Sequence, residues 1–221
     1  IDWRFTMELY RSSNNHGDVI GRAMDVPPRT VIIDEGDPAR SVYKIQVGQV
    51  MLSKLLPDGR RQIFELLGPG SIFGVTPNQR HDSVAESLTD TKLSIFERSW
   101  LNHVPSIENS FVHCLEAQIC ALHDHAVLLG RKTATERVST YILNLVNGHD
   151  QNSEQTQSHV FVIVPMTRSE IADYLGLTLE TVSRAFSRLK RLGVISYERH
   201  DGPMRVAIHR LGPLTGTYWT A

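Results

Sequence analysis

The stretch 167–192, TRSEIADYLGLTLETVSRAFSRLKRL, decides how the rest of the chain is interpreted, because its pattern predicts two short helices joined by a tight turn. Thr167 and Glu170 form a capping box, in which each side chain accepts a hydrogen bond from a free backbone amide at a helix start. Gly176 suits the left-handed backbone conformation that commonly follows a helix. Thr178 can cap a second helix. The stretch therefore predicts a helix-turn-helix.

The second of these helices is predicted to be amphipathic. Its apolar residues Val182, Phe186 and Leu189 recur near the helical period and should pack against the first helix. The opposite face carries Glu180, Ser183, Arg184, Ser187, Arg188, Lys190 and Arg191. Arginine can donate two hydrogen bonds to a guanine edge, and glutamate can accept one from a cytosine amino group. Lysines and arginines nearer the C-terminal end of such a helix lie beside phosphates. This face predicts a DNA recognition helix, and a surface helix with a solvated charged face is the plainer alternative.

The residues that follow extend the motif. VISYER (194–199), HDGP (200–203) and MRVAIHR (204–210) predict a strand, a turn and a second strand, which together would make a winged helix-turn-helix. Residues 167–210 contain eight Lys and Arg and five Asp and Glu, whereas the whole chain has a net charge of −1. This asymmetry favours a polyanionic partner at this end of the chain.

Composition sets the class of protein. The chain has 221 residues, of which 41% are hydrophobic, enough for one large or two ordinary globular domains. It has no apolar run long enough to cross a bilayer, so a cytoplasmic protein without a membrane partner is expected. Its two cysteines, Cys114 and Cys120, are too few for a disulfide framework and fit a reducing compartment.

The N-terminal half predicts a β-roll. Residues 1–28 are weakly patterned, and alternating or apolar segments then follow at 29–37, 42–56 and 61–74, with further strand at 83–96. Glycine-rich turns separate these segments at the spacing of an all-β domain. No residue pattern in this domain resembles an enzyme site.

A long helix is predicted at 106–131. Apolar residues recur there at alternating spacings of three and four over nearly three heptads, which is typical of a helix that pairs with another helix. They are Val112, Leu115, Ile119, Leu122, Ala126 and Leu129. Since a helix-turn-helix protein usually reads two half-sites, a two-fold dimer is the preferred interpretation. Packing of this seam on the chain's own β-domain is the alternative.

The predicted fold class is α+β: a β-roll at 1–105 resembling a cyclic-nucleotide-binding jelly roll, a dimerisation helix at 106–131, and a winged helix-turn-helix domain at 132–221. Within the last domain, 133–147 predicts an amphipathic helix, 147–159 a polar loop and 160–164 a strand.

This order of parts, together with the string MTRSEIADYLGLTLETVSRAFSRL (166–189), resembles the CRP/FNR superfamily of bacterial transcription regulators over nearly the whole chain. The string looks most like the FNR and FixK branches. The resemblance implies that Glu180, Ser183 and Arg184 read a TTGA-type half-site, and Leu179 stands where the cAMP-binding branch has an arginine. The implied operator is of the TTGAT-N4-ATCAA kind. The expected DNA contacts are Thr178, Leu179, Glu180, Ser183, Arg184, Arg168, Ser187 and Arg188.

The sensor positions depart from the family's cyclic-nucleotide pattern. That pattern is F-x-G-E followed by an Arg-Ser pair, because the glutamate holds the ribose and the arginine neutralises the phosphate. Here the segment GSIFGVTPNQRHDSVAES (70–87) has Val75 in place of the glutamate and His81 with Asp82 in place of Arg-Ser. We therefore expect no cAMP binding, although Arg80 lies nearby and could substitute for the arginine.

The cysteines and histidines do not match the family's other sensors. FNR holds an iron–sulfur cluster with an N-terminal cysteine group and one internal cysteine. On the heptad register Cys114 and Cys120 fall at outer positions, about 240° round the helix and about 9 Å along it, so they cannot pair. His123 and His125 face different sides of the helix, and His113 is interpreted with them as solvated or packed. Haem-dependent nitric oxide sensors occur in the superfamily, without a ligand motif that can be matched here.

Together these features predict a homodimeric, sequence-specific DNA-binding regulator that needs no cofactor and is not an enzyme. The resemblance further implies an activator whose β-roll contacts RNA polymerase. One alternative is a regulator of the same fold gated by haem, nitric oxide or a small molecule. A remote alternative is a metal-binding protein built around His113, Cys114, Cys120, His123 and His125.

Overall fold

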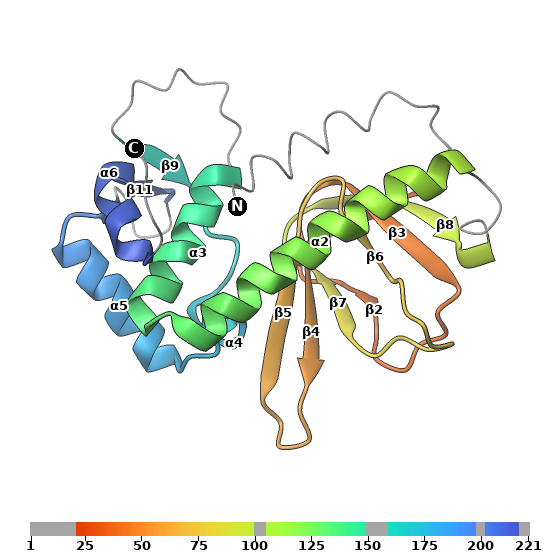
Figure 1. Ribbon diagram of the computed structural model, residues 1–221, viewed down its shortest axis with the longest axis horizontal. Coiled ribbons are helices and arrows are strands. Elements are labelled where there is room, and N and C mark those ends of the chain that lie inside the picture. Colours follow the sequence, from red (N-terminus) through yellow and green to blue (C-terminus); the bar gives the residue numbers. More distant parts are fainter. Residues whose placement is uncertain (1–20, 100–104, 149–158, 198–201, 217–221) are drawn as a thin grey trace. The chain divides into compact units, whose positions relative to one another are not determined.

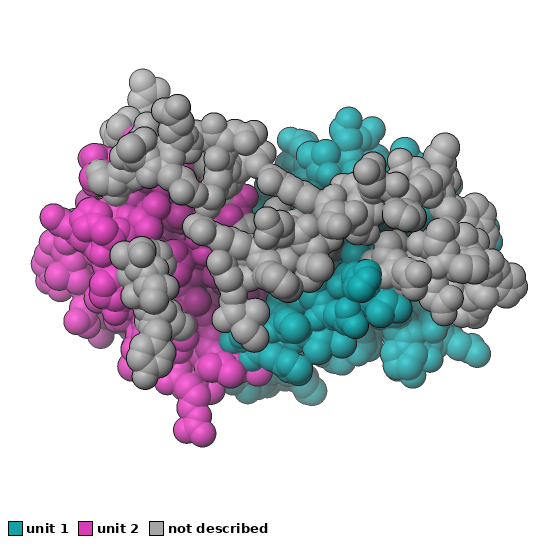
Figure 2. Space-filling view, turned by 45° about the horizontal axis from the view of Figure 1, so that its top comes forward, with its two compact units in different colours: residues 1–125 teal, residues 126–221 magenta. Residues whose placement is uncertain are grey.

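The computed structural model describes residues 21–99, 105–148, 159–197 and 202–216 of the chain, and the side chains of its long helix from residue 111 onward. The chain divides into two compact units, residues 1–125 and 126–221, which Figure 2 colours separately. No helix among the described residues is long and apolar enough to cross a membrane.

The first unit contains two antiparallel four-stranded sheets, which confirms the predicted β-roll (Figure 1). One sheet has the order β1-β8-β3-β6 and the other the order β2-β7-β4-β5. The strands are β1 (Arg22–Val26), β2 (Val31–Ile33), β3 (Ser41–Val47), β4 (Val50–Leu55), β5 (Arg61–Leu67), β6 (Ile72–Phe73), β7 (Val84–Ser87) and β8 (Thr91–Glu97). The core contains one apolar side chain from each of these strands: Val26, Ile33, Ile45, Val50, Leu67, Phe73, Ala85 and Leu93.

Gly48 makes the sharp connection between β3 and β4. Its φ of 93° lies in the region that favours glycine, and a Cβ there would collide with the Asp90 carbonyl oxygen. The segment 42–56 therefore forms two strands joined by a turn rather than one continuous strand. Strand β1 was not predicted, because 22–25 are exposed and the strand is held by its backbone pairing with β8 rather than by an alternating pattern.

Helix α2 (Pro105–Arg131) confirms the predicted long helix. One of its faces packs on the β-roll of its own unit, where Phe111 and Cys114 join Val42 and Ile72 in a buried cluster. A neighbouring face of the helix is exposed to solvent. The helix thus carries two apolar faces at different angles around its axis.

The second unit contains the helix-turn-helix and a small sheet. Its elements are α3 (Ala134–Gly148), β9 (Val160–Val162), α4 (Arg168–Leu175), α5 (Leu179–Arg191), β10 (Ile195–Tyr197), β11 (Met204–Val206), α6 (Ile208–Leu211) and the 3-10 helix η3 (Gly212–Thr215). The three strands form an antiparallel sheet in the order β10-β11-β9. Its core is made by fully buried side chains of the helices and strands, among them Val138, Ile142, Ile171, Leu175, Val182, Leu189, Ile195, Met204 and Leu211.

The prediction of a strand through 204–210 was wrong at its end. Strand β11 stops at Val206, and the chain turns into the short helix α6. The reason is tertiary packing, because a helix places Leu211 fully inside the core. Of the predicted wing turn, 200–201 lie outside the described residues.

Candidate nucleic-acid interface

Helix α4 starts and ends as the sequence predicts. The Thr167 amide donates to the Glu170 carboxylate at 2.7 Å, and the Glu170 amide donates to Thr167 Oγ1 at 3.2 Å, which completes the capping box. Gly176 ends the helix with φ 60° and ψ 44°, a left-handed conformation. The turn of the helix-turn-helix is therefore fixed on both sides by local hydrogen bonds.

Helix α5 begins at the cap formed by Thr178, whose Oγ1 accepts from the Thr181 amide at 3.2 Å. Its apolar residues Val182, Phe186 and Leu189 are buried, as predicted, and hold the helix against the rest of the unit. This orientation turns the opposite face toward solvent. The residues of that face are Leu179, Glu180, Ser183, Arg184, Ser187, Arg188, Lys190 and Arg191.

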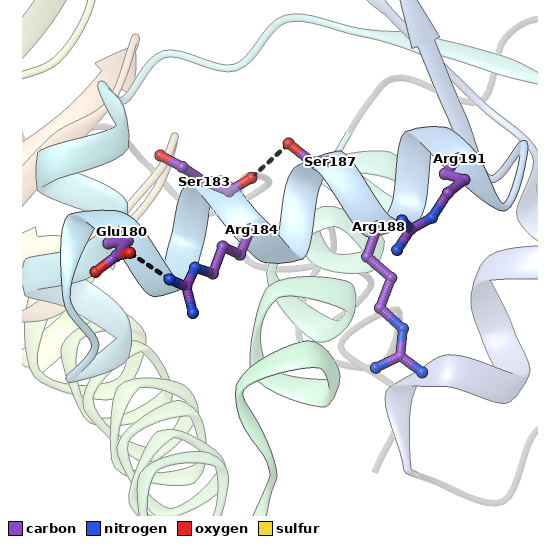
Figure 3. Close-up of a pocket in the computed structure, with 6 residues that line it drawn as sticks. All are labelled: Glu180, Ser183, Arg184, Ser187, Arg188 and Arg191. Atoms are coloured by element: carbon purple, nitrogen blue, oxygen red, sulfur yellow. Dashed lines mark hydrogen bonds and ion pairs between the residues drawn. The ribbon is translucent and has the colours of Figure 1, made fainter.

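The exposed polar residues of α5 lie in a row along one helix (Figure 3). Glu180 and Arg184 point toward each other and form an ion pair at 2.5 Å, with side chains 71% and 78% exposed. Ser187 Oγ donates to the Ser183 carbonyl oxygen at 2.9 Å. An open hollow of about 510 Å³ is lined by Glu180, Ser183, Arg184, Ser187, Arg188 and Arg191. This face offers a carboxylate acceptor, hydroxyls and several cations to a ligand.

Arg168 lies in a different setting from the other predicted contacts. Its guanidinium carbon is 3.1 Å from the centre of the Phe186 ring, and Nη2 donates to the Tyr197 hydroxyl at 2.9 Å. The side chain therefore joins α4, α5 and β10. This packing role could not be predicted from the sequence, because the partners lie 18 and 29 residues away and no local spacing signals them.

The β-roll positions at which the family's cyclic-nucleotide pattern has a glutamate and an Arg-Ser pair carry different side chains. Val75 is 46% exposed, and Arg80 Nη1 donates to the Gly36 carbonyl oxygen at 2.6 Å. Asp82 is 3.5 Å from Lys54 Nζ. His81 is buried, and burial lowers its pKa, with the Arg98 charge adding to the decrease and the nearby aspartates opposing it. One N–H of the Arg80 guanidinium is thus engaged by a backbone carbonyl.

The two thiols differ in environment. The expectation that Cys114 lies on the outer side of the helix was wrong, because it is buried against the β-roll with Sγ 3.7 Å from the Gly70 carbonyl oxygen. Cys120 is exposed. Of the nearby histidines, His113 has its Nδ1 3.2 Å from the Glu116 carboxylate. In the part of the chain that the structure describes, no three His, Cys, Asp or Glu side chains are grouped so that they could hold a metal ion.

The apolar seam of α2 is mostly open. Val112 is 46%, Ile119 51% and Leu122 37% exposed, and Ala126 is also exposed. Leu115 is half-buried against the Val42 and Ile72 cluster of the β-roll. Leu129, also half-buried, lies beside Gly176 of the helix-turn-helix.

Comparisons with known proteins agree with this architecture. Residues 23–104 match the cyclic nucleotide-binding domain, and 136–214 match the Crp-like helix-turn-helix domain. The nitrogen fixation regulation protein FixK of Bradyrhizobium diazoefficiens is 33% identical over 181 residues, which cover 80% of this chain and 75% of the relative. The transcriptional activatory protein AadR of Rhodopseudomonas palustris is 34% identical, covering 74% of this chain and 69% of the relative.

Among solved structures, FixK2 of Bradyrhizobium japonicum superimposes with a TM-score of 0.75 at 33% sequence identity. The match covers 91% of this chain and all of that one. These relatives are regulators of transcription and not enzymes.

Proposed function

Because the chain belongs to the FixK/FNR branch of the CRP/FNR superfamily, we propose that it is a homodimeric transcription activator that binds a TTGAT-N4-ATCAA palindrome. Each protomer would place α5 in the major groove of one half-site. Glu180, Ser183 and Arg184 would read base edges. Thr178, Leu179, Arg168, Ser187 and Arg188 complete the proposed contact set.

The single observation that carries this proposal is the outer face of α5. Glu180, Ser183 and Arg184 are all exposed within the first two turns of the helix, while its apolar side is buried. Groove-reading helices use this arrangement, because residues near the N-terminus reach base edges and later cations meet phosphates. Ser187, Arg188, Lys190 and Arg191 continue the row toward the C-terminal end.

The homodimer is supported by the open seam of α2. Val112, Ile119 and Leu122 present apolar side chains to solvent at heptad spacing. A second copy of the helix, related by a two-fold axis, would cover them and would place two recognition helices on a palindromic site. Proteins of this kind work on chromosomal DNA, so we place the function in the cytoplasm.

An electrophoretic shift assay at 150 mM salt tests the proposal. The purified protein should bind the TTGAT-N4-ATCAA duplex at least ~10³-fold more tightly than a scrambled duplex of the same length, since specific binding usually exceeds non-specific binding by this much or more. Equal binding of the two duplexes would overturn the proposed function. Transcription from a promoter that carries the palindrome, with RNA polymerase added, tests activation.

We also propose that DNA binding needs no cAMP. The Arg80 guanidinium is held by the Gly36 carbonyl, Asp82 would repel a phosphate, and Val75 offers no acceptor to a ribose. Adding 1 mM cAMP to the shift assay should therefore leave the affinity for the palindrome unchanged. A marked increase in affinity would favour the effector-gated alternative.

A further inference from the structure

In the part of the second unit that the structure describes, Arg137 on α3 donates to several backbone carbonyl oxygens and to no carboxylate. Its guanidinium donates to backbone carbonyl oxygens of three separate segments: Leu129 at 2.6 Å through Nη2, Lys132 at 3.0 Å through Nε, and Leu175 at 2.8 Å through Nη1. A fourth contact reaches Gly176 at 3.5 Å. Each segment has a distinct place in the fold.

These segments are the ends of two helices and the connection between helices. Leu129 lies in the last turn of α2, Lys132 lies in the two-residue connection to α3, and Leu175 ends α4. The last carbonyls of a helix have no partner within the helix and carry partial negative charge. A guanidinium has N–H donors in several directions and can satisfy these carbonyls together, whereas a lysine ammonium is a compact point charge.

Further hydrogen bonds lie around the same connection between α2 and α3. Thr133 and Glu136 form a second capping box, with the Thr133 amide donating to the Glu136 carboxylate at 2.7 Å. Lys132 Nζ donates to Thr140 Oγ1 at 2.9 Å. Gly176 has no Cβ, and an added one would lie 3.6 Å from Arg137 Nη1 and 3.5 Å from Leu129. The end of α2 and the turn of the helix-turn-helix therefore meet closely around one side chain.

We infer that Arg137 is a positioning residue, which fixes the helix-turn-helix on the end of α2 and thereby sets the half-site spacing that a dimer can read. This inference rests on the proposed function. Arg137 itself need not touch DNA. Its effect would arise because two half-sites are engaged together only when both recognition helices are held at the right separation, and that gain disappears when the geometry is lost.

The test compares Arg137→Gln with Arg131→Gln, the same substitution at an exposed arginine in the last turn of α2. Binding is measured on the N4 palindrome, on palindromes with three or five central base pairs, and on a duplex with one half-site. For Arg137→Gln we expect ~10- to 100-fold weaker binding to the N4 palindrome and a flattened spacing preference, with half-site binding within about twofold of the parent chain. Arg131→Gln should keep the parent's spacing preference.

A second measurement keeps the inference separate from the proposed function. Amide hydrogen exchange without DNA should be faster in Arg137→Gln than in Arg131→Gln at Lys132 and Leu177, whose amides bond to Leu128 and Ala172 on either side of the junction. If the parent chain shows no preference for the palindrome, the proposed function fails. The exchange rates then decide by themselves whether Arg137 holds the helix-turn-helix on the end of α2. Unchanged exchange would overturn the inference, as would equal losses on palindrome and half-site.

Arg137→Lys provides a variant that keeps the charge. A single ammonium can meet one or two of the three carbonyls, so both the spacing preference and the exchange rates should lie between those of the parent chain and Arg137→Gln. A lysine variant that loses half-site binding together with palindrome binding would indicate a general loss of folding and would contradict a positioning role.

Discussion

The guanidinium of Arg184 already has a partner in the free protein. It is paired with Glu180, yet both side chains are more than 70% exposed. An ion pair this exposed contributes only about 0–1 kcal/mol, so the side chain can exchange the carboxylate for a guanine edge at small cost. The pair keeps both groups on the exposed side of α5, which the proposed function assigns to the DNA groove.

Replacing Arg184 by alanine should weaken binding to the palindrome by about 1–3 kcal/mol and relax discrimination at the guanine it contacts. Lys190→Ala is the matched cation control, and it should weaken binding to all sequences alike, because this exposed side chain would lie near phosphates in the proposed complex. Fluorescence anisotropy on duplexes with single base changes measures both effects. An Arg184→Ala variant with undiminished base preference would contradict the assigned contact.

Glu65 on β5 should make stability depend on pH. Burial raises its pKa above the ordinary value of 4.5, and the hydrogen bond from Gln118 Nε2 at 3.0 Å offsets part of this rise. Between 4.5 and the raised pKa the folded state binds more protons than the unfolded state, so this group's contribution to stability falls as pH rises through that window.

Glu65→Gln removes this titration and can keep the contact with Gln118. We therefore expect the unfolding free energy of the parent chain, minus that of the variant, to decrease as the pH is raised from below 4.5 to neutral. Urea unfolding at a series of pH values gives the difference. Parallel pH profiles for the two proteins would show that Glu65 titrates alike in both states.

At the element scale, the helix starts of the second unit are set by local sequence. Thr167→Ala removes the side chain that accepts from the Glu170 amide, so it should lower the free energy of unfolding by about 0.5–2 kcal/mol. Ser169→Ala, an exposed change in the same first turn, is the control and should have a small effect. Chemical denaturation measures both, and equal midpoints would contradict the capping role.

The same locality explains which elements the sequence predicts well. Both helices of the helix-turn-helix begin at threonine caps, and α2 and α3 follow their apolar period to within a residue or two. Elements fixed by distant contacts were predicted less well. The exposed edge strand β1 was not predicted, and 208–211 form a helix because Leu211 is buried in the core, although the segment alternates like a strand.

Single side chains follow the same rule. Glu180, Ser183 and Arg184 are exposed as predicted, because the apolar period of α5 fixes which face is left over. The burial of Cys114 and the stacking of Arg168 on Phe186 could not be predicted from spacing, since each depends on a partner brought close by the tertiary fold. A heptad seam marks one face of α2 and does not reveal the second.

At the scale of the whole molecule, assembly is the property to test. Ile119→Glu places a charge in the exposed seam, and it should convert a dimer to monomers without disturbing the β-roll, because this side chain is 51% exposed. Val127→Glu is a matched control on the same helix, at a 56% exposed position outside the seam. Analytical ultracentrifugation measures the mass, and a monomeric parent chain would end the dimer proposal.

The contrast between the two cysteines has a practical consequence. The chain contains only two, and because Cys114 is buried while Cys120 is exposed, a thiol-reactive dye should attach at one known point without mutagenesis. Donor and acceptor dyes placed on separate batches of unaltered chain would exchange energy whenever two copies meet along α2. The molecule thus carries its own attachment point for observing subunit exchange in real time.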